Sequence, residues 1–265
     1  MKVEFINHAS VIISSNETKI FCDPWIDGSI FNEGWDHIIK TKFNKDRFKE
    51  ISYIWFSHEH PDHFSTSTLK SVDENIRSSI TVLYQTTKDK KVLNFCKSLG
   101  YQIFELPNMK RVKLNKDFEI ICGKSGFYDS WLFLKDDKHS LMNLNDCHVD
   151  SKSDAININK KINNQKINVL LSQFSYAAWR GNKEDSLLRK DEAENKLNIL
   201  KNQIDILQPD SFIPFASYIY FSHVENKYLN DQINKSYELV NLYENTKTIL
   251  MYPGDIWEMN NDFSS

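Results

Sequence analysis

The stretch Ser57-His58-Glu59-His60-Pro61-Asp62-His63 decides the fold, because it places three histidines and two carboxylates directly after the apolar residues 51–56. Neutral imidazole nitrogens and carboxylate oxygens are ligands for divalent transition metals. In an extended backbone His58 and His60 point to the same side and can face one metal ion, whereas Asp62 and His63 turn towards a neighbouring point. The spacing therefore predicts two adjacent metal sites rather than a polar loop with solvated histidines.

The pattern His-x-His-x-Asp-His, with Ser57 before it and Phe64-Ser65 after it, resembles the signature of the metallo-β-lactamase superfamily. This resemblance implies an α/β fold, the αββα sandwich of two mixed sheets flanked by helices. The hydrophobic pattern agrees, because βα units are followed by meander strands. We expect a single metallo-β-lactamase-like domain over residues 1–265, since no linker, repeat or low-complexity tract interrupts the chain.

Local patterns locate the individual elements. The clearest helical pattern covers residues 187–207 and stops before Pro209, and a second late helix is expected over residues 230–243. Shorter helices are expected at 67–72 and 88–99. Strand patterns cover residues 3–6, 10–13, 19–22, 51–56, 80–84, 101–106, 111–114, 118–122, 131–134, 140–144, 167–174, 211–216 and 248–251.

Composition excludes several classes of partner. The chain has 265 residues, 40% of them hydrophobic, which suffices for a sizeable core. A formal net charge of -3 gives no basic surplus, so neither nucleic acid nor an anionic membrane is indicated as a partner. No apolar stretch is long enough to span a bilayer and the N-terminus lacks a signal core, so we expect a cytoplasmic protein. The four cysteines show no CxxC pairing, which argues against a structural zinc site, an iron–sulfur cluster or a disulfide framework.

The superfamily resemblance implies the other metal ligands. Asp146 lies at the tip of an apolar strand, where the superfamily has the carboxylate that bridges its two metals. His223, after a strand in the last quarter of the chain, is the best candidate for the last histidine and would join Asp62 and His63 on the second metal. In a hydrolytic reaction Asp62 would also orient the attacking hydroxide. The resemblance therefore assigns catalytic roles to Asp62 and Asp146.

One ligand position departs from the superfamily pattern. Superfamily hydrolases usually have a histidine just before the strand that leads to the bridging aspartate, but residues 126–131 contain none. Asp129 is the residue there that can bind a metal. The first metal would then have two imidazoles and carboxylates as ligands, and oxygen-rich coordination favours iron or manganese over zinc. We therefore expect two divalent ions, iron in preference to zinc or manganese.

Two residues near the start of the chain are harder to assign. Asp23 follows strand 19–22 and precedes Pro24, so it is either an ordinary turn former or a carboxylate that supports the metal-binding histidines from behind. Both alternatives stay open. His8 is interpreted as a strand histidine and not as a ligand.

Several side chains are candidates for a substrate pocket. Trp35, Tyr176, Trp179 and Arg180 lie on expected loops, and Arg180 can pair with a phosphate or a carboxylate. Tyr218 and Glu225 flank His223 in the sequence and are further candidates. Packing in the core explains the tyrosine equally well.

A broader resemblance links the chain to CMP-N-acetylneuraminate hydroxylases. Residues 23–35, 58–65, 145–147, 173–177 and 207–223 look like their metallo-β-lactamase-like part. Those hydroxylases also carry a Rieske iron–sulfur module, whose Cys-x-His and Cys-x-x-His pairs are missing from this sequence. The sugar-nucleotide substrate and its electron route therefore do not carry over.

Two enzyme functions follow, with a third class beside them. The favoured one is an oxygenase, in which a di-iron centre activates O2 to oxidise a small metabolite, with electrons from a separate protein or from the substrate. The alternative is a zinc- or manganese-dependent hydrolase of an ester, lactone, amide or phosphodiester. A metal-free binding protein is the third class, and it is disfavoured because nearly every ligand position is chemically occupied.

Overall fold

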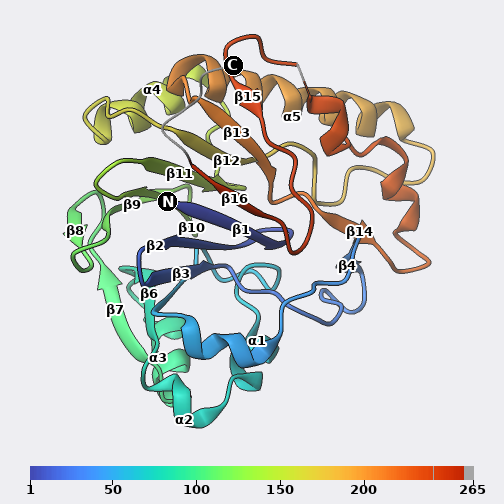
Figure 1. Cartoon of the computed structure of the whole chain (residues 1–265). Helices are drawn as coiled ribbons and strands as arrows, with labels where there is room; N and C mark the ends of the chain where they lie inside the picture. The colour runs from blue at the N-terminus through green and yellow to red at the C-terminus, as the bar shows by residue number, and fades with distance from the viewer. Residues whose placement is uncertain (241, 260–265) are drawn as a thin grey trace.

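Two seven-stranded sheets lie face to face in the computed structural model, which describes residues 1–240 and 242–259 (Figure 1). The first sheet has the order β16-β1-β2-β3-β5-β6-β7. Its strands are β1 (Lys2–Asn7), β2 (Ser10–Ser15), β3 (Thr18–Cys22), β5 (Tyr53–Trp55), β6 (Thr81–Gln85), β7 (Gln102–Leu106) and β16 (Ile256–Glu258).

The second sheet has the order β15-β13-β12-β11-β10-β9-β8. Its strands are β8 (Arg111–Lys113), β9 (Glu119–Ser125), β10 (Asp129–Lys135), β11 (Ser140–Asn145), β12 (Val169–Gln173), β13 (Ser211–Phe215) and β15 (Lys247–Thr248). A separate pair joins β4 (Trp35–His37) to β14 (Ile219–Phe221).

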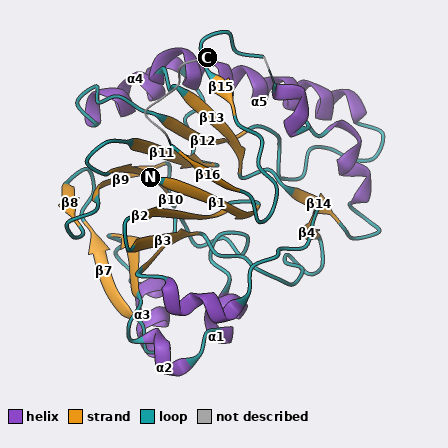
Figure 2. Cartoon of the chain, viewed as in Figure 1, coloured by secondary structure: helices purple, strands orange, loops and turns teal. Residues whose placement is uncertain are grey.

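Helices cover the outer face of each sheet (Figure 2). The first sheet is covered by α1 (Thr66–Ser71), α2 (Glu74–Arg77) and α3 (Lys91–Ser98), and the second by α4 (Lys152–Lys161) and α5 (Ser186–Leu207). Between the sheets, buried residues of both form one apolar cluster, in which Val11 and Trp55 of the first sheet join Leu132 and Leu171 of the second. The predicted αββα sandwich is confirmed.

The long helix α5 forms where the apolar spacing predicted it. Leu200, Ile204 and Leu207 recur at helical spacing and are buried against the second sheet. The helix ends at Gln208, which has a φ of +47° and precedes Pro209, a residue that cannot continue a helix. No helix among residues 1–240 and 242–259 is long and apolar enough to cross a membrane.

The expected helix over residues 230–243 is not formed, and residue 241 lies outside the described residues. The chain instead makes the 3-10 turns η2 (Lys227–Gln232) and η3 (Ser236–Leu239), with extended backbone at Ile233 and Lys235. The side-chain amide of Asn234 donates to the carbonyls of Phe174 and Ala193, at 2.8 and 2.7 Å. This asparagine fastens the segment to β12 and α5 through bonds that compete with a continuous helix.

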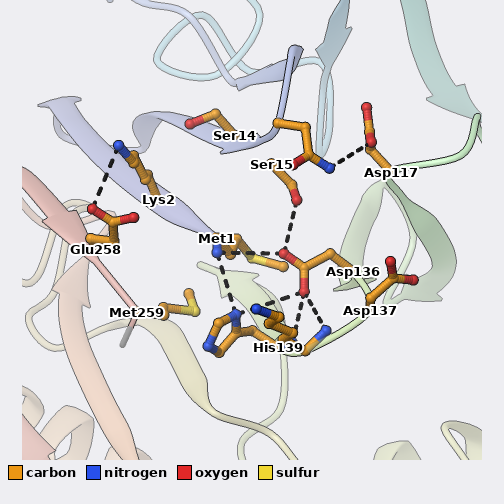
Figure 3. A pocket seen from close by; sticks show the side chains of 12 residues that line it. Met1, Lys2, Ser14, Ser15, Asp117, Asp136, Asp137, His139, Glu258 and Met259 are labelled. Carbon is orange, nitrogen blue, oxygen red and sulfur yellow. Dashed lines mark hydrogen bonds and ion pairs between the residues drawn. The ribbon is translucent and has the colours of Figure 1, made fainter. Parts of the chain in front are cut away.

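Polar contacts fasten the β2–β3 turn of the first sheet to the edge of the second (Figure 3). The Ser15 hydroxyl donates to Asp136 at 3.0 Å, and the Thr18 hydroxyl donates to Asp117 at 2.6 Å. Asp136 also accepts the backbone N–H of His139 at 2.7 Å, which fixes the turn between β10 and β11. The third 3-10 turn, η1 (Lys45–Glu50), belongs to the connection that leads into β5.

Candidate metal centre

The candidate centre forms at one edge of the sandwich because several strands end there. In the first sheet β1, β3 and β5 run in the same direction, so His8, Asp23 and the Ser57–His63 motif all emerge at their carboxyl ends. In the second sheet β11 ends at this edge and is followed by Asp146, while the antiparallel neighbour β10 begins there with Asp129. Both sheets therefore contribute side chains to one place.

Asp23 holds the motif in place through hydrogen bonds. It is fully buried, and its carboxylate accepts hydrogen bonds from the Ser57 backbone N–H at 2.7 Å, the Ser57 hydroxyl at 2.7 Å and His63 Nδ1 at 2.8 Å. An ionised carboxylate only accepts, so His63 Nδ1 carries a proton, and in the neutral ring the lone pair is on Nε2. Asp23 has a φ of +43°, a conformation rare outside glycine, which aims the carboxylate back at the motif.

His63 Nε2 faces two carboxylates without forming a hydrogen bond. It lies 3.3 Å from Asp62 Oδ2 and 3.5 Å from Asp146 Oδ2, yet it is a buried atom with no hydrogen-bond partner among residues 1–240 and 242–259. Within the same described part of the chain, Asp62 Oδ1 and Asp146 Oδ1 are also buried without a hydrogen-bond partner. Buried polar atoms are nearly always satisfied, so this group of donor atoms fits a bound cation.

The charges at the centre shift the pKa values of its members. Burial lowers the pKa of His63, but the carboxylates of Asp146, Asp62 and Asp23 outweigh it, and the net pKa is raised well above its ordinary value. Without a metal ion His63 is therefore protonated on both ring nitrogens at neutral pH, and a bound cation would replace the proton on Nε2. Burial raises the pKa of Asp62 and of Asp146, but nearby imidazoles outweigh it, so both carboxyl groups have lowered pKa values. The carboxylates are thus ionised at neutral pH, the form that binds metal.

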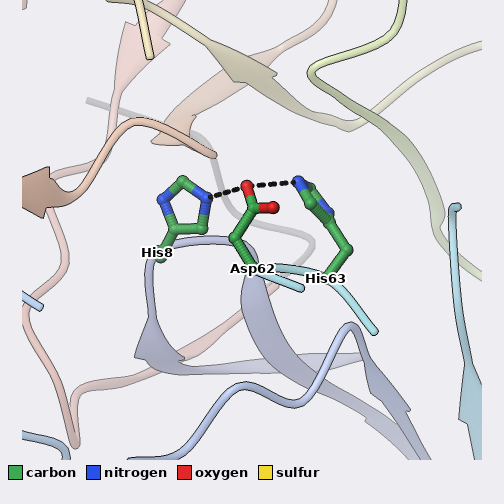
Figure 4. A group of neighbouring side chains, drawn as sticks. All are labelled: His8, Asp62 and His63. Carbon is green, nitrogen blue, oxygen red and sulfur yellow. Dashed lines mark hydrogen bonds and ion pairs between the residues drawn. The ribbon is translucent and has the colours of Figure 1, made fainter. Parts of the chain in front are cut away.

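His8 lies beside Asp62, which the sequence did not predict (Figure 4). Its ring is buried, and His8 Nε2 is 3.3 Å from Asp62 Oδ2, so that His8, Asp62 and His63 form a group able to hold a metal ion. The residue occupies the turn between β1 and β2 with a φ of +36°. The only sequence signal for His8 as a possible ligand was its position in a tight turn. That position brings it near the motif only because β1 and β5 end at the same edge of the sheet.

The first half of the motif forms a second group with Asp129 and Asp146. His58 Nε2 lies 2.9 Å from His60 Nδ1, and His58 Nδ1 lies 3.7 Å from Asp129 Oδ1 and 3.8 Å from Asp146 Oδ1. His58, His63 and Asp146 have donor atoms close enough to share one ion. Burial and the charge of Asp146 raise the pKa of Asp129 to about 6, and burial lowers the pKa of His58 to about 4. A neutral imidazole beside crowded carboxylates suits a divalent ion.

His223, predicted as a ligand of the second metal, lies outside both groups of candidate donor atoms among the described residues. It follows β14 with a side chain that is 42% exposed, and its Nδ1 accepts the backbone N–H of Glu225 at 3.3 Å. Glu225 has a side chain that is 87% exposed. The strand of this region that does reach the centre, β13, is followed by Ala216, which has no ligand atom.

The predicted pocket residues divide into two sets. Trp35, Trp179 and Arg180 line a cavity of about 430 Å³ that also contains Asp62, Asp129 and Asp146. Tyr176 and Tyr218 serve packing instead. The Tyr176 hydroxyl is buried and donates to the Leu229 carbonyl at 2.6 Å, and the Tyr218 ring packs edge-on between Phe5 and Phe174.

Comparison with known proteins finds a matching family model and related sequences. The family model described as a β-lactamase superfamily domain matches residues 2–171. Cytidine monophosphate-N-acetylneuraminic acid hydroxylase of Danio rerio is 24% identical over 282 residues, which cover 96% of this chain and 45% of that protein. The chain thus spans about half the length of the curated relatives it matches.

Two solved structures share the fold at low identity. CmlA, a diiron beta-hydroxylase from Streptomyces venezuelae, superposes with a TM-score of 0.67 at 13% identity, over 97% of this chain and 54% of that one. A possible metal-dependent hydrolase from Veillonella parvula gives a TM-score of 0.67 at 11% identity, over 98% of this chain and 99% of that one. The fold is therefore common to a hydroxylase and to a protein described as a hydrolase.

Proposed function

The chain belongs to the β-lactamase superfamily, and on that premise we propose that it is a dinuclear metal-dependent oxygenase of a small metabolite, with iron as the metal. One observation carries the proposal. The position expected to hold a third histidine is filled by Asp129, whose carboxylate lies 3.7 Å from His58 and faces the same cavity as Asp62 and Asp146. A ligand set this rich in oxygen favours iron over zinc.

The proposed ligands form two sets joined by Asp146. His58, His60 and Asp129 would hold the first ion, and Asp62 and His63 the second. For the remaining imidazole on the second ion the sequence favoured His223, but the contacts support His8, which is buried 3.3 Å from Asp62. Asp23 would act through His63, since its hydrogen bond to Nδ1 keeps Nε2 free for the ion.

The other residues of the centre bind and orient rather than react. Ser57 connects the parts, because its hydroxyl lies 3.0 Å from His58 Nδ1 and 3.1 Å from His63 Nδ1 while donating to Asp23. Trp35 and Trp179 wall the cavity above the carboxylates. When bound, a pair of iron ions supplies the capacity to activate O2. The reducing electrons would come from the substrate or from a separate donor protein.

Relatives support this choice without fixing the substrate. The Danio rerio relative is named a hydroxylase and CmlA is described as a diiron beta-hydroxylase. A metallo-hydrolase is the second candidate, favoured by the equal TM-score of the possible hydrolase from Veillonella parvula. In that reaction the unpartnered Oδ1 of Asp62 would orient the attacking water.

Metal analysis tests the proposal. The protein is expressed with supplemented iron, purified without oxygen and analysed for iron, zinc and manganese, and its absorption spectrum is recorded before and after O2 is added. We expect bound iron and an O2-dependent spectral change. Zinc without iron under these conditions would refute the oxygenase, and anaerobic turnover of phosphodiester or lactone substrates would establish the hydrolase.

A matched variant sharpens the experiment. Asp129→His supplies the imidazole that superfamily hydrolases usually have at this position. We expect the metal preference to move towards zinc, because an imidazole replaces an oxygen ligand. Unchanged iron binding by this variant would remove Asp129 as the residue that selects the metal.

A further inference from the structure

Lys196 places a positive charge in the wall of the cavity that contains the proposed metal ligands. It projects from α5 into the lining shared with Asp129 and Asp146. Its ammonium donates to the neutral side-chain amide of Gln173 at 2.7 Å. In the part of the chain that the structure describes, no carboxylate forms an ion pair with Lys196 Nζ. An ammonium has three donors, so two remain for a ligand in the cavity beyond the bond to Gln173.

The surroundings of Lys196 make a single positive charge costly. Burial lowers its pKa, against the opposing charges of Asp150, Glu192 and Asp146. A half-buried ammonium without a paired anion is an unusual arrangement, because lysines generally keep their charge in water or pair it. An anion bound from the cavity would supply the missing partner.

Arg180 differs from Lys196 because it already has a partner. Its guanidinium pairs with Glu192 at 3.2 Å and donates to the Trp179 carbonyl at 2.9 Å. Glu192 lies four residues before Lys196 on α5, so the helix holds both cations on one side of the cavity. A guanidinium has five N–H donors, and those that remain can reach a ligand at the rim.

We propose that Lys196 binds an oxyanion of the substrate, a carboxylate or a phosphate, with Arg180 as a second donor at the rim. This inference rests on the proposed function, since it makes the cavity over the metals the substrate site. A cavity of about 430 Å³ holds a small metabolite. The 63% exposed ring of Trp179 is available to cover an apolar or planar part of it.

Binding of three simple probes tests the assignment. Phenyl phosphate, benzoate and the neutral benzyl alcohol are titrated into the protein as isolated, and binding is followed by calorimetry. We expect one of the two anions to bind and the alcohol not to. The stronger anion shows whether the site takes a phosphate or a carboxylate. Equal binding of benzyl alcohol would overturn the proposal.

Variants separate Lys196 from the metals and from a structural role. Lys196→Met should weaken binding of the favoured anion by about 10- to 100-fold, the loss expected for a charge-assisted hydrogen bond, while Lys196→Arg should restore most of it. The matched control is Lys201→Met on the same helix, where the exposed Lys201 pairs with Asp205. Wild-type affinity in Lys196→Met would refute the assignment.

Metal content is measured in each variant, and the titrations are repeated after EDTA treatment. Anion binding that needs Lys196 and survives EDTA would uphold this inference even if the metal analysis refuted the oxygenase. Anion binding that disappears with the metals and is indifferent to Lys196→Met would instead assign the anion to the metals and refute the role of Lys196.

Discussion

The substitution Asp23→Asn tests the reasoning about the centre most directly, because it changes charge and donor pattern without changing size. The asparagine side chain can still accept the Ser57 backbone N–H through its oxygen, but its NH₂ group then faces His63 Nδ1. Two donors cannot share that contact. The proton of His63 must move to Nε2, the atom that faces Asp62 and Asp146. The lone pair intended for the metal is then lost.

The magnitude follows from the number of bonds affected. Asp23 accepts three hydrogen bonds, of which the Ser57 backbone bond survives and the Ser57 hydroxyl can rotate to the new amide. The charge-assisted bond from His63 becomes a weaker neutral bond that the amide donates to Nδ1, and both Ser57 bonds lose their charge assistance, so the free energy of unfolding of the metal-free protein should fall by about 2 kcal/mol. Metal affinity should fall by roughly 10- to 100-fold, as for other partners of metal-binding histidines.

Three measurements check this expectation. Urea denaturation in EDTA gives the stability, dialysis against buffered metal gives the affinity, and long-range nitrogen–proton NMR correlations give the tautomer of His63. The matched control is Asp191→Asn on the exposed side of α5. A metal affinity within about twofold of wild type, with His63 still protonated on Nδ1, would refute the role assigned to Asp23.

Three further predictions concern the ligands, the pH dependence and α5. His8→Ala should about halve the bound metal while His223→Ala retains it, as measured by metal analysis, and the reverse result would return the ligand role to His223. Burial lowers the pKa of His37 from 6.5 to about 4, so the folded protein keeps this ring neutral and should lose stability as the pH falls from 6.5 to about 4. His37→Phe should remove about 3 kcal/mol of that loss in urea titrations, and an unchanged pH profile would contradict the burial argument. Arg189 is buried and makes paired bonds to Asp231 at 2.7 and 2.8 Å, while the Asp231 side chain is 34% exposed. Arg189→Met should therefore lower the free energy of unfolding by roughly 1.5 to 3 kcal/mol in urea denaturation, because the aspartate left behind is partly solvated. A loss below about 0.5 kcal/mol would show that the pair does not stabilise the fold.

The residues at the centre of the site could be predicted from their spacing in the sequence. The motif around His58 and His63 depends on a few consecutive residues after a strand, so its geometry follows from the period of the backbone. Asp129 and Asp146 could be named because the superfamily resemblance implies metal ligands at these two strand ends, and the structure brings both carboxylates to within 3.7 and 3.8 Å of His58 Nδ1. The αββα arrangement followed from the family that this motif suggests.

The roles of residues that depend on strand order could not be predicted from the sequence in this way. His8 reaches Asp62 only because β1, β3 and β5 share a direction, which no local pattern reveals. His223 is the converse, because it has the right residue type after a strand but lies in a loop beyond β14. The missing late helix has a different cause, since Asn234 bonds to other parts of the chain and no propensity rule anticipates those partners.

The convergence of both sheets on one edge has a mechanical consequence. His8 and the motif belong to the first sheet, while Asp129 and Asp146 belong to the second. Ions bound by all of these residues would therefore link the two sheets. Substitutions that slide one layer against the other, even far from the cavity, should then alter metal retention before they unfold the protein. The amount of bound metal would thus report on the relative position of the two sheets.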